Sequence, residues 1–264
     1  MDNRAIGIFD SGLGGLTAMK ALQELLPEEN IIYFGDTGRL PYGAKTRAQL
    51  RRMAVQDLDL IAAGGVKAIL VACGTLSSNA ADILDGYPIP TFGVLKAGVS
   101  GMSKVPGAGL LGVIATEASV RSGSFERALR EACPEREILA VPCPDFVPLI
   151  ESGHDSDHPA VREAVARYCE KLRGADAVLL GCTHYGIIGR AITEFLGPET
   201  ALVSASVCGA AQVAQYLIVN GLTGGCGEER FFASGDPADF TRAASTFLGR
   251  PMARGAEQAP LMEF

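Results

Sequence analysis

Short apolar segments that end in small polar residues recur along the chain. Residues 66–73 (VKAILVAC) form an apolar run that is too short for a long helix, and small hydroxylic residues follow it closely. Residues 176–182 (DAVLLGC) repeat this pattern, with Cys182 at the position of Cys73. Apolar runs of about four to eight residues, closed by residues that can cap a following helix, are typical of buried strands in a parallel α/β sheet. The pattern therefore predicts two strands that each end in a thiol.

The repeat extends beyond the two cysteines. Residues 5–11 (AIGIFDS) align without gaps with residues 110–116 (LLGVIAT), so that Ser11 matches Thr116. Such self-similarity predicts two related α/β units. Ligands bind at the carboxyl ends of the strands in sheets of this kind. Two facing units would therefore place the two thiols on opposite walls of one cleft.

Periodicity predicts the remaining elements. Further strands are expected at residues 5–9, 30–34, 87–94, 109–114, 138–141 and 230–234, and helices at residues 16–26, 46–64, 119–131, 158–173 and 205–220. The fold class is α/β, with two pseudo-symmetric domains that have parallel central sheets and an active site in the cleft between them. The first half lacks a C-terminal helix layer of its own, so the tail is expected to return to it. We expect residues 1–95 and 208–264 in the first domain and residues 96–207 in the second.

Two strand-to-helix loops are candidates for ligand contacts. Residues 10–15 (DSGLGG) form a glycine-rich turn, which lets backbone N–H groups approach an anion. Its spacing is not GxGxxG, which disfavours a dinucleotide and leaves a small polar ligand or a purely structural turn. The loop of residues 35–43 (GDTGRLPYG) is long for its position, and either a functional loop or a simple turn is compatible with it.

Composition excludes several classes of function. The chain has 264 residues, 48% of them hydrophobic, and a net charge of −7, so it can bury a full core but lacks the basic footprint of a nucleic-acid-binding protein. An odd number of cysteines (seven), without CxxC or a signal peptide, indicates reduced thiols and a cytoplasmic location. No apolar run reaches the roughly 20 residues that span a membrane. His154 and His158 lack a third ligand, so no metal site is predicted.

Six motifs resemble, in order and spacing, those of the glutamate racemase family. They are IGIFDSGLGGLT, YFGDTGRLPYG, the Cys-x-Thr stretch at Cys73, PLIESG at Glu151, LGCTHYG at Cys182 and FFASGDP near the C-terminus. The similarity covers nearly the whole chain. It implies racemisation of L- and D-glutamate without pyridoxal phosphate or another cofactor, which would supply D-glutamate for peptidoglycan in cell-wall biogenesis.

The resemblance also assigns roles to residues. Cys73 and Cys182 would be the catalytic acid and base, assisted by Asp10, Glu151 and His184. The predicted substrate-binding residues are Asp10, Ser11, Pro41, Tyr42, Gly43, Gly74, Thr75, Thr116, Thr183 and His184. Inverting an α-carbon requires removal of a proton from one face and delivery to the other, which two facing thiols can perform. Because a free thiol titrates near pH 8.5, the base needs a neighbour such as His184 to tune it.

The chain departs from the family pattern at three positions. Gly74 replaces the asparagine of Cys-Asn-Thr, Gly186 replaces the proline of Thr-His-Tyr-Pro, and Lys96 replaces the acid of a GVIEP-like stretch. Loss of the amide at position 74 predicts roughly ten- to a hundredfold weaker glutamate binding unless another group, such as Lys96, takes its place. Alternatively, the glycine makes room for a different substrate.

Other functions stay compatible with the sequence. One is a related racemase, isomerase or decarboxylase acting on another small acid, and another is a low-activity binding or regulatory homologue. The expected partner is a small molecule, glutamate, rather than nucleic acid or a membrane. A homodimer is compatible with the sequence, which does not determine the oligomeric state.

Overall fold

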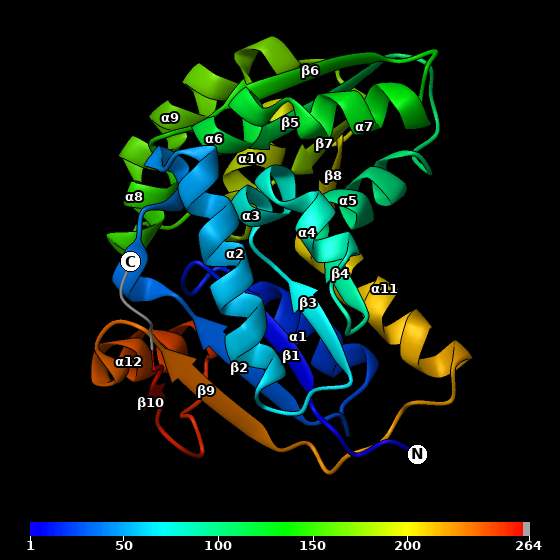
Figure 1. The fold of residues 1–264 in the computed structure, drawn as a ribbon. Helices are drawn as coiled ribbons and strands as arrows, with labels where there is room; N and C mark the ends of the chain where they lie inside the picture. Colours follow the sequence, from blue (N-terminus) through cyan, green and yellow to red (C-terminus); the bar gives the residue numbers. More distant parts are fainter. Residues whose placement is uncertain (261–264) are drawn as a thin grey trace.

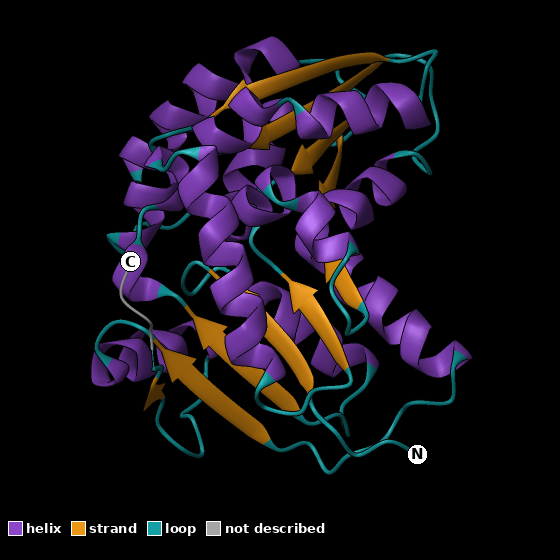
Figure 2. Cartoon of the chain, viewed as in Figure 1, coloured by secondary structure: helices purple, strands orange, loops and turns teal. Residues whose placement is uncertain are grey.

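Two parallel sheets organise the fold, which we describe from a computed structural model for residues 1–260 (Figure 1). The six strands of the first sheet are, in spatial order, β10 (Glu257–Gln258), β9 (Glu229–Ala233), β2 (Ile31–Gly35), β1 (Ile6–Asp10), β3 (Ala68–Val71) and β4 (Thr91–Gly93). The four strands of the second are β6 (Glu137–Pro142), β5 (Leu110–Ala115), β7 (Ala177–Leu180) and β8 (Ala201–Ser204). Helices pack around both sheets (Figure 2). The predicted α/β class is confirmed.

The helices connect and cover the strands. The α-helices are α1 (Leu16–Leu25), α2 (Arg47–Ala62), α3 (Gly74–Asn79), α4 (Ala81–Asp85), α5 (Val94–Met102), α6 (Glu117–Ser122), α7 (Ser124–Ala132), α8 (Phe146–Glu151), α9 (Pro159–Cys169), α10 (Gly189–Leu196), α11 (Ala205–Val219) and α12 (Pro237–Leu248). Four 3-10 turns accompany them: η1 (Thr37–Arg39), η2 (Tyr42–Ala44), η3 (Glu170–Leu172) and η4 (Thr183–Ile188). The single helix predicted for residues 119–131 is wrong, because Gly123 adopts a left-handed conformation (φ 65°) and separates α6 from α7.

The sequence repeat corresponds to a repeat in strand order. The order β2-β1-β3-β4 in the first sheet matches β6-β5-β7-β8 in the second. The matched glycines of β1 and β5 have the same packing role. A Cβ atom on Gly7 would lie 2.2 Å from a methyl group of Ile61, and one on Gly112 would lie 2.8 Å from Leu172. Both glycines therefore make room for a side chain of the helical layer.

The chain crosses between the sheets near residues 93–98 and 204–209. Both crossings lead directly into helices, α5 after β4 and α11 after β8, and these two helices contact each other. A Cβ atom on Gly98 would lie 2.9 Å from a methyl group of Leu179 and 3.1 Å from the Cβ atom of Ala205. The crossings are thus closely packed, while the domain limits at residues 95 and 207 stay a prediction.

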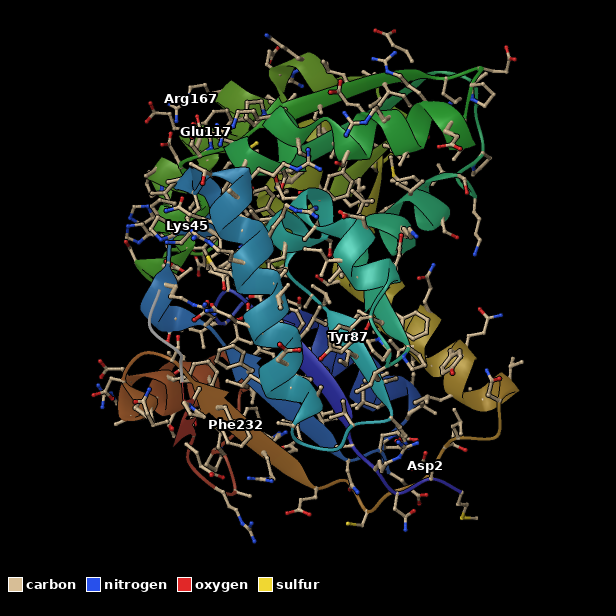
Figure 3. All side chains as sticks on the ribbon, in the orientation of Figure 1. Asp2, Lys45, Tyr87, Glu117, Arg167 and Phe232 are labelled. Carbon is tan, nitrogen blue, oxygen red and sulfur yellow. The ribbon has the colours of Figure 1, made fainter. Side chains whose placement is uncertain are left out.

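The tail returns to the first sheet, as expected, because β9 pairs with β2 and α12 contacts α1. The units of the two sheets also meet where η2 contacts α6, and Figure 3 places Lys45, which follows η2, and Glu117 of α6 on the same side of the molecule. None of the helices in the described part of the chain is both long and apolar enough to cross a membrane.

Candidate active site

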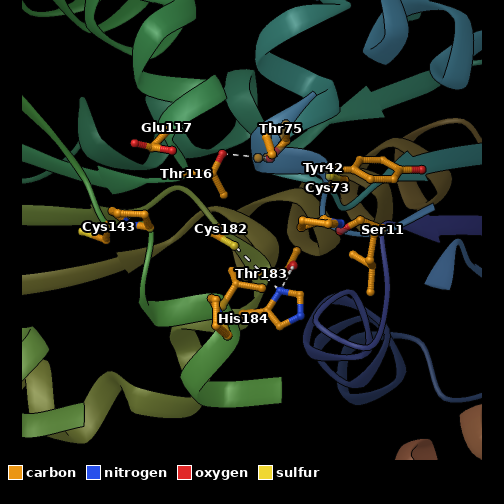
Figure 4. Close-up of a pocket in the computed structure, with 18 residues that line it drawn as sticks. Ser11, Tyr42, Cys73, Thr75, Thr116, Glu117, Cys143, Cys182, Thr183 and His184 are labelled. Carbon is orange, nitrogen blue, oxygen red and sulfur yellow. Dashed lines mark hydrogen bonds between the residues drawn. The ribbon is translucent and has the colours of Figure 1, made fainter. Parts of the chain in front are cut away.

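A cavity of about 160 Å³ lies where the carboxyl ends of the two sheets meet (Figure 4). The predicted residues that line it are Ser11, Pro41, Tyr42, Gly43, Cys73, Gly74, Thr75, Thr116, Cys182, Thr183 and His184. Two predicted residues, Asp10 and Glu151, lie behind this lining and contact it. Residues from both halves of the chain thus meet in one small cavity, in the place that the repeat predicts.

The two thiols occupy different environments. Cys73 follows β3 and is buried, with 3% of its surface exposed. Burial raises the pKa of Cys73, and the negative charge of Asp10 raises it further, so this sulfur holds its proton at neutral pH. Cys182 follows β7 on the other side of the cavity, and its Sγ atom lies 3.8 Å from Nδ1 of His184. One thiol therefore lies near a carboxylate and the other beside an imidazole.

His184 connects Cys182 to Glu151. Its Nε2 atom lies 3.3 Å from Oε1 of Glu151, an ion-pair distance without the alignment of a hydrogen bond. Burial lowers the pKa of His184, but Cys182, Glu151 and Asp10 outweigh burial and raise the pKa to about 10. The imidazole is therefore a cation at neutral pH, and it lies beside the sulfur of Cys182.

Asp10 lies beneath the cavity at the end of β1. It accepts hydrogen bonds from the backbone N–H groups of Gly12 (3.1 Å) and Gly15 (3.0 Å) and from the hydroxyl of Thr183 (3.3 Å). Burial raises the pKa of Asp10, whereas His184 and these donors lower it in part. Asp10 thus does not line the cavity itself, but it binds the hydroxyl of Thr183, which does.

Two hydroxyl contacts join the sheets across the cleft. Oγ1 of Thr75 lies 2.9 Å from Oγ1 of Thr116, and Oγ1 of Thr183 donates to Oδ1 of Asp10. Each contact joins the segment after a cysteine strand in one unit to the end of the first strand in the other. The two contacts therefore lie at corresponding strand ends of the repeat, although Thr116 aligns with Ser11 rather than with Asp10.

Buried charged side chains hold the loop that contains Tyr42 in place. The Tyr42 hydroxyl donates to carboxylates of Asp36 and Asp57 and points away from the two cysteines (Figure 4). Nε of Arg39 pairs with Asp36 at 2.6 Å, and its other nitrogens contact Asp57 and Gln56. Burial, and then the charge of Asp36, raise the pKa of Asp57 to about 8. These contacts hold the 41–43 segment against the cavity.

Two expectations about the family departures are wrong. Lys96 does not replace an amide in the cavity, because its Nζ atom pairs at 2.7 Å with Asp85 on the exposed surface. Gly74 does not make room for a different substrate in the direction of its missing side chain, because a Cβ atom there would lie 1.9 Å from the carbonyl oxygen of Gly181. The space left by the missing side chain is occupied by backbone.

The histidine pair is a packing feature. The rings of His154 and His158 stack with centroids 3.6 Å apart, and Nδ1 of His158 caps α9 by accepting from the N–H of Ala160. No cluster of three or more metal-ligating side chains occurs among residues 1–260.

Sequence reasoning missed part of the cavity wall. The additional lining residues are Leu40, Ala44, Glu117, Cys143, Pro144, Val147 and Pro148. Four of these belong to the segment between β6 and the middle of α8. That segment follows β6, and its only signal was the Cys-Pro pair at 143–144 in a strand-to-helix connection.

Two thiols at matched strand ends of two α/β units define a class of enzymes that move a proton at carbon. The model of the family Asp/Glu/Hydantoin racemase matches residues 13–212. Glutamate racemase of Chlorobaculum tepidum is 39% identical over 251 residues, which is 92% of this chain and 92% of the relative. The chain belongs to the Asp/Glu/hydantoin racemase family.

Solved structures agree with this assignment. Glutamate racemase from Francisella tularensis, in complex with D-glutamate, has a TM-score of 0.87 and 36% identity, with 96% of this chain and 97% of that chain covered. Glutamate racemase from Thermus thermophilus, in complex with β-chloro-D-alanine, has a TM-score of 0.86 and 37% identity, with 98% of each chain covered. The similarity thus includes both sheets and the cavity between them.

Proposed function

We propose that this protein interconverts L- and D-glutamate by proton transfer between Cys73 and Cys182, without a cofactor. The observation that carries the proposal is that both thiols line one small cavity from matched strand ends. The choice of glutamate rests on the relatives, one of which has D-glutamate in its structure. The product D-glutamate would enter peptidoglycan synthesis in the cytoplasm. Assembly as a homodimer stays a prediction.

The differing environments of the thiols suggest how one direction begins. Cys182, as a thiolate stabilised by the His184 cation, takes the α-proton, so that the Cα–H bond breaks and an S–H bond forms. Cys73, which holds its proton, then delivers that proton to the opposite face of the α-carbon. The enantiomer leaves behind a Cys73 thiolate and a Cys182 thiol, which is the starting state for the reverse direction.

Hydroxyl groups and backbone supply the polar contacts for the substrate. Ser11, Thr75, Thr116 and Thr183 line the cavity together with the backbone of Gly43. Donors of this kind can bind the two carboxylates and stabilise the negative charge that develops as the α-proton leaves. Among the described residues that line the cavity, His184 alone carries a positive charge.

Incubation of L- or D-glutamate with the enzyme in deuterated water tests the proposal. We expect the α-proton signal to disappear and both enantiomers to form. Cys73→Ala and Cys182→Ala should each lower racemisation by about a hundred- to ten-thousandfold, the usual contribution of general acid–base catalysis. Cys226→Ala removes an exposed thiol that does not line the cavity and should keep the wild-type rate.

The same experiment separates the alternatives. Racemisation at the wild-type rate by Cys73→Ala or by Cys182→Ala would refute the two-thiol mechanism. Exchange of the α-proton without formation of the other enantiomer would indicate a different carbanion enzyme. Binding of glutamate without any exchange would indicate a binding or regulatory protein.

A further inference from the structure

The backbones beside the two thiols touch each other. Gly74 directly follows Cys73, and Gly181 directly precedes Cys182. A Cβ atom on Gly74 would lie 1.9 Å from the carbonyl oxygen of Gly181 and 3.0 Å from its carbonyl carbon. Cβ atoms essentially never approach another heavy atom within 3.0 Å, so any side chain at position 74 requires movement.

Backbone atoms lie on both sides of this contact. The obstacle at Gly181 is a backbone carbonyl rather than the end of a flexible side chain. Gly181 is held to β5, because its N–H donates to the carbonyl of Ile114 at 2.9 Å, and a Cβ atom on Gly181 would lie 3.1 Å from the Cβ atom of Ala115. Gly74 begins α3, whose six residues are all buried. Relief of the clash therefore requires a shift of backbone on at least one side of the cleft.

We infer that Gly74 is a positioning residue that sets the separation of the two thiols. Its contact with Gly181 lets the Cys73 and Cys182 walls close to a distance that a side chain at position 74 would prevent. This inference rests on the proposed racemisation. It also implies that hydroxyl and backbone groups bind the substrate in the cavity. The close approach of the two walls then replaces the binding contribution of the side-chain amide that is missing at position 74.

The inference predicts an effect that distinguishes reactions needing two thiols from reactions needing one. Racemisation needs both sulfurs within reach of the same α-carbon, and a misplacement of about 1 Å can cost on the order of a hundredfold in rate. Elimination from a glutamate that carries chlorine on its β-carbon needs only the thiolate. The thiolate takes the α-proton, a carbon–carbon double bond forms and chloride leaves, after which water hydrolyses the enamine to a 2-oxo acid and ammonia.

The experiment compares both reactions in wild type, Gly74→Ala and Gly74→Asn, using both enantiomers of the chlorinated analogue. We expect Gly74→Ala to lower kcat for racemisation about a hundredfold, with a smaller change in KM and elimination within a few-fold of wild type. Gly74→Asn should be at least as impaired, although it restores the amide of the family motif. Gly189→Ala is the matched control, because a Cβ atom there meets nothing within 4 Å.

The outcomes separate this inference from the proposed function. The ratio of racemisation to elimination is measured on one sample, so partial misfolding of a variant does not change it. An unchanged ratio in Gly74→Ala, or faster racemisation in Gly74→Asn, would overturn the inference alone. A wild-type enzyme that eliminates chloride but does not racemise glutamate would overturn the proposed function and the inference with it.

Discussion

At the scale of single residues, the site depends on how protons are distributed over a few buried groups. Cys73 is held as a thiol by burial and by the charge of Asp10, whereas Cys182 lies beside the His184 cation. The two sulfurs are equivalent in the sequence repeat and differ in their neighbours. A two-base reaction needs this difference, because one sulfur must begin with a proton and the other without one.

The charge on His184 makes a pH-dependent contribution to stability. The pKa of the folded state, about 10, exceeds the ordinary value of 6.5, so the folded protein keeps a proton that the unfolded chain loses between these values. The stabilisation is complete below pH 6.5 and is lost as the pH rises towards 10. Urea unfolding should give a higher free energy of unfolding for wild type than for His184→Gln at low pH. This difference should shrink by up to about 1.4 kcal/mol for each unit by which the pH is raised. A difference that stays constant or grows over this range would contradict the assignment.

The sequence predicted which residues line the cavity better than how they interact. Strand ends marked by cysteine and hydroxyl residues led to Cys73, Thr116 and Cys182, because side chains at the carboxyl edge of a parallel sheet converge. The clash at Gly74 could not be predicted in this way. It depends on the distance between backbones of two separate units, and a local motif contains no information about that distance.

At the scale of elements, long periodic segments were predicted well, and the shortest ones only where, as in β3 and β7, a thiol closes an apolar run. The helix expected at residues 46–64 is α2, with a Thr46 capping box at its start. The six-residue helix α3 and the four-residue strand β8 were missed, because segments of this length contain too few residues to define a period. The break at Gly123 was missed because a glycine within an amphipathic pattern does not by itself end a helix.

The connection between α2 and the Tyr42 loop gives a prediction at this scale. Tyr42→Phe would remove a hydrogen-bond donor from the buried carboxylates of Asp36 and Asp57, so it should lower the free energy of unfolding by about 1–3 kcal/mol and raise KM for glutamate. Tyr87→Phe is the matched control, because its hydroxyl bonds to Asp59 on the exposed surface (Figure 3). Thermal and urea unfolding of both variants test this expectation, and equal losses would show that the buried contacts do not anchor the loop.

At the scale of the whole molecule, a shared hydrophobic core joins the two sheets on one side, and the cavity lies between their strand ends on the other. A single cluster of buried hydrophobic residues includes Leu70 of the first sheet, Leu179 of the second and residues of α5 and α11 between them. The cavity lies at the strand ends, where the units meet through hydroxyl and backbone contacts. We therefore expect any opening of the cleft to turn about the packed crossings at α5 and α11.

The shared core predicts that both sheets unfold together. Leu179 is fully buried in β7, and Leu179→Ala should cost about 2–5 kcal/mol because it removes packing and leaves a cavity. Since the cluster continues into the first sheet, hydrogen exchange should accelerate in β1 and β3 as well as in β5 and β7. Leu25→Ala, at a half-exposed position of α1 (50%), is the matched control and should change exchange little. Faster exchange confined to the second sheet would mean that the units unfold independently, and closure of the cleft would then depend on the cavity contacts rather than on the common core.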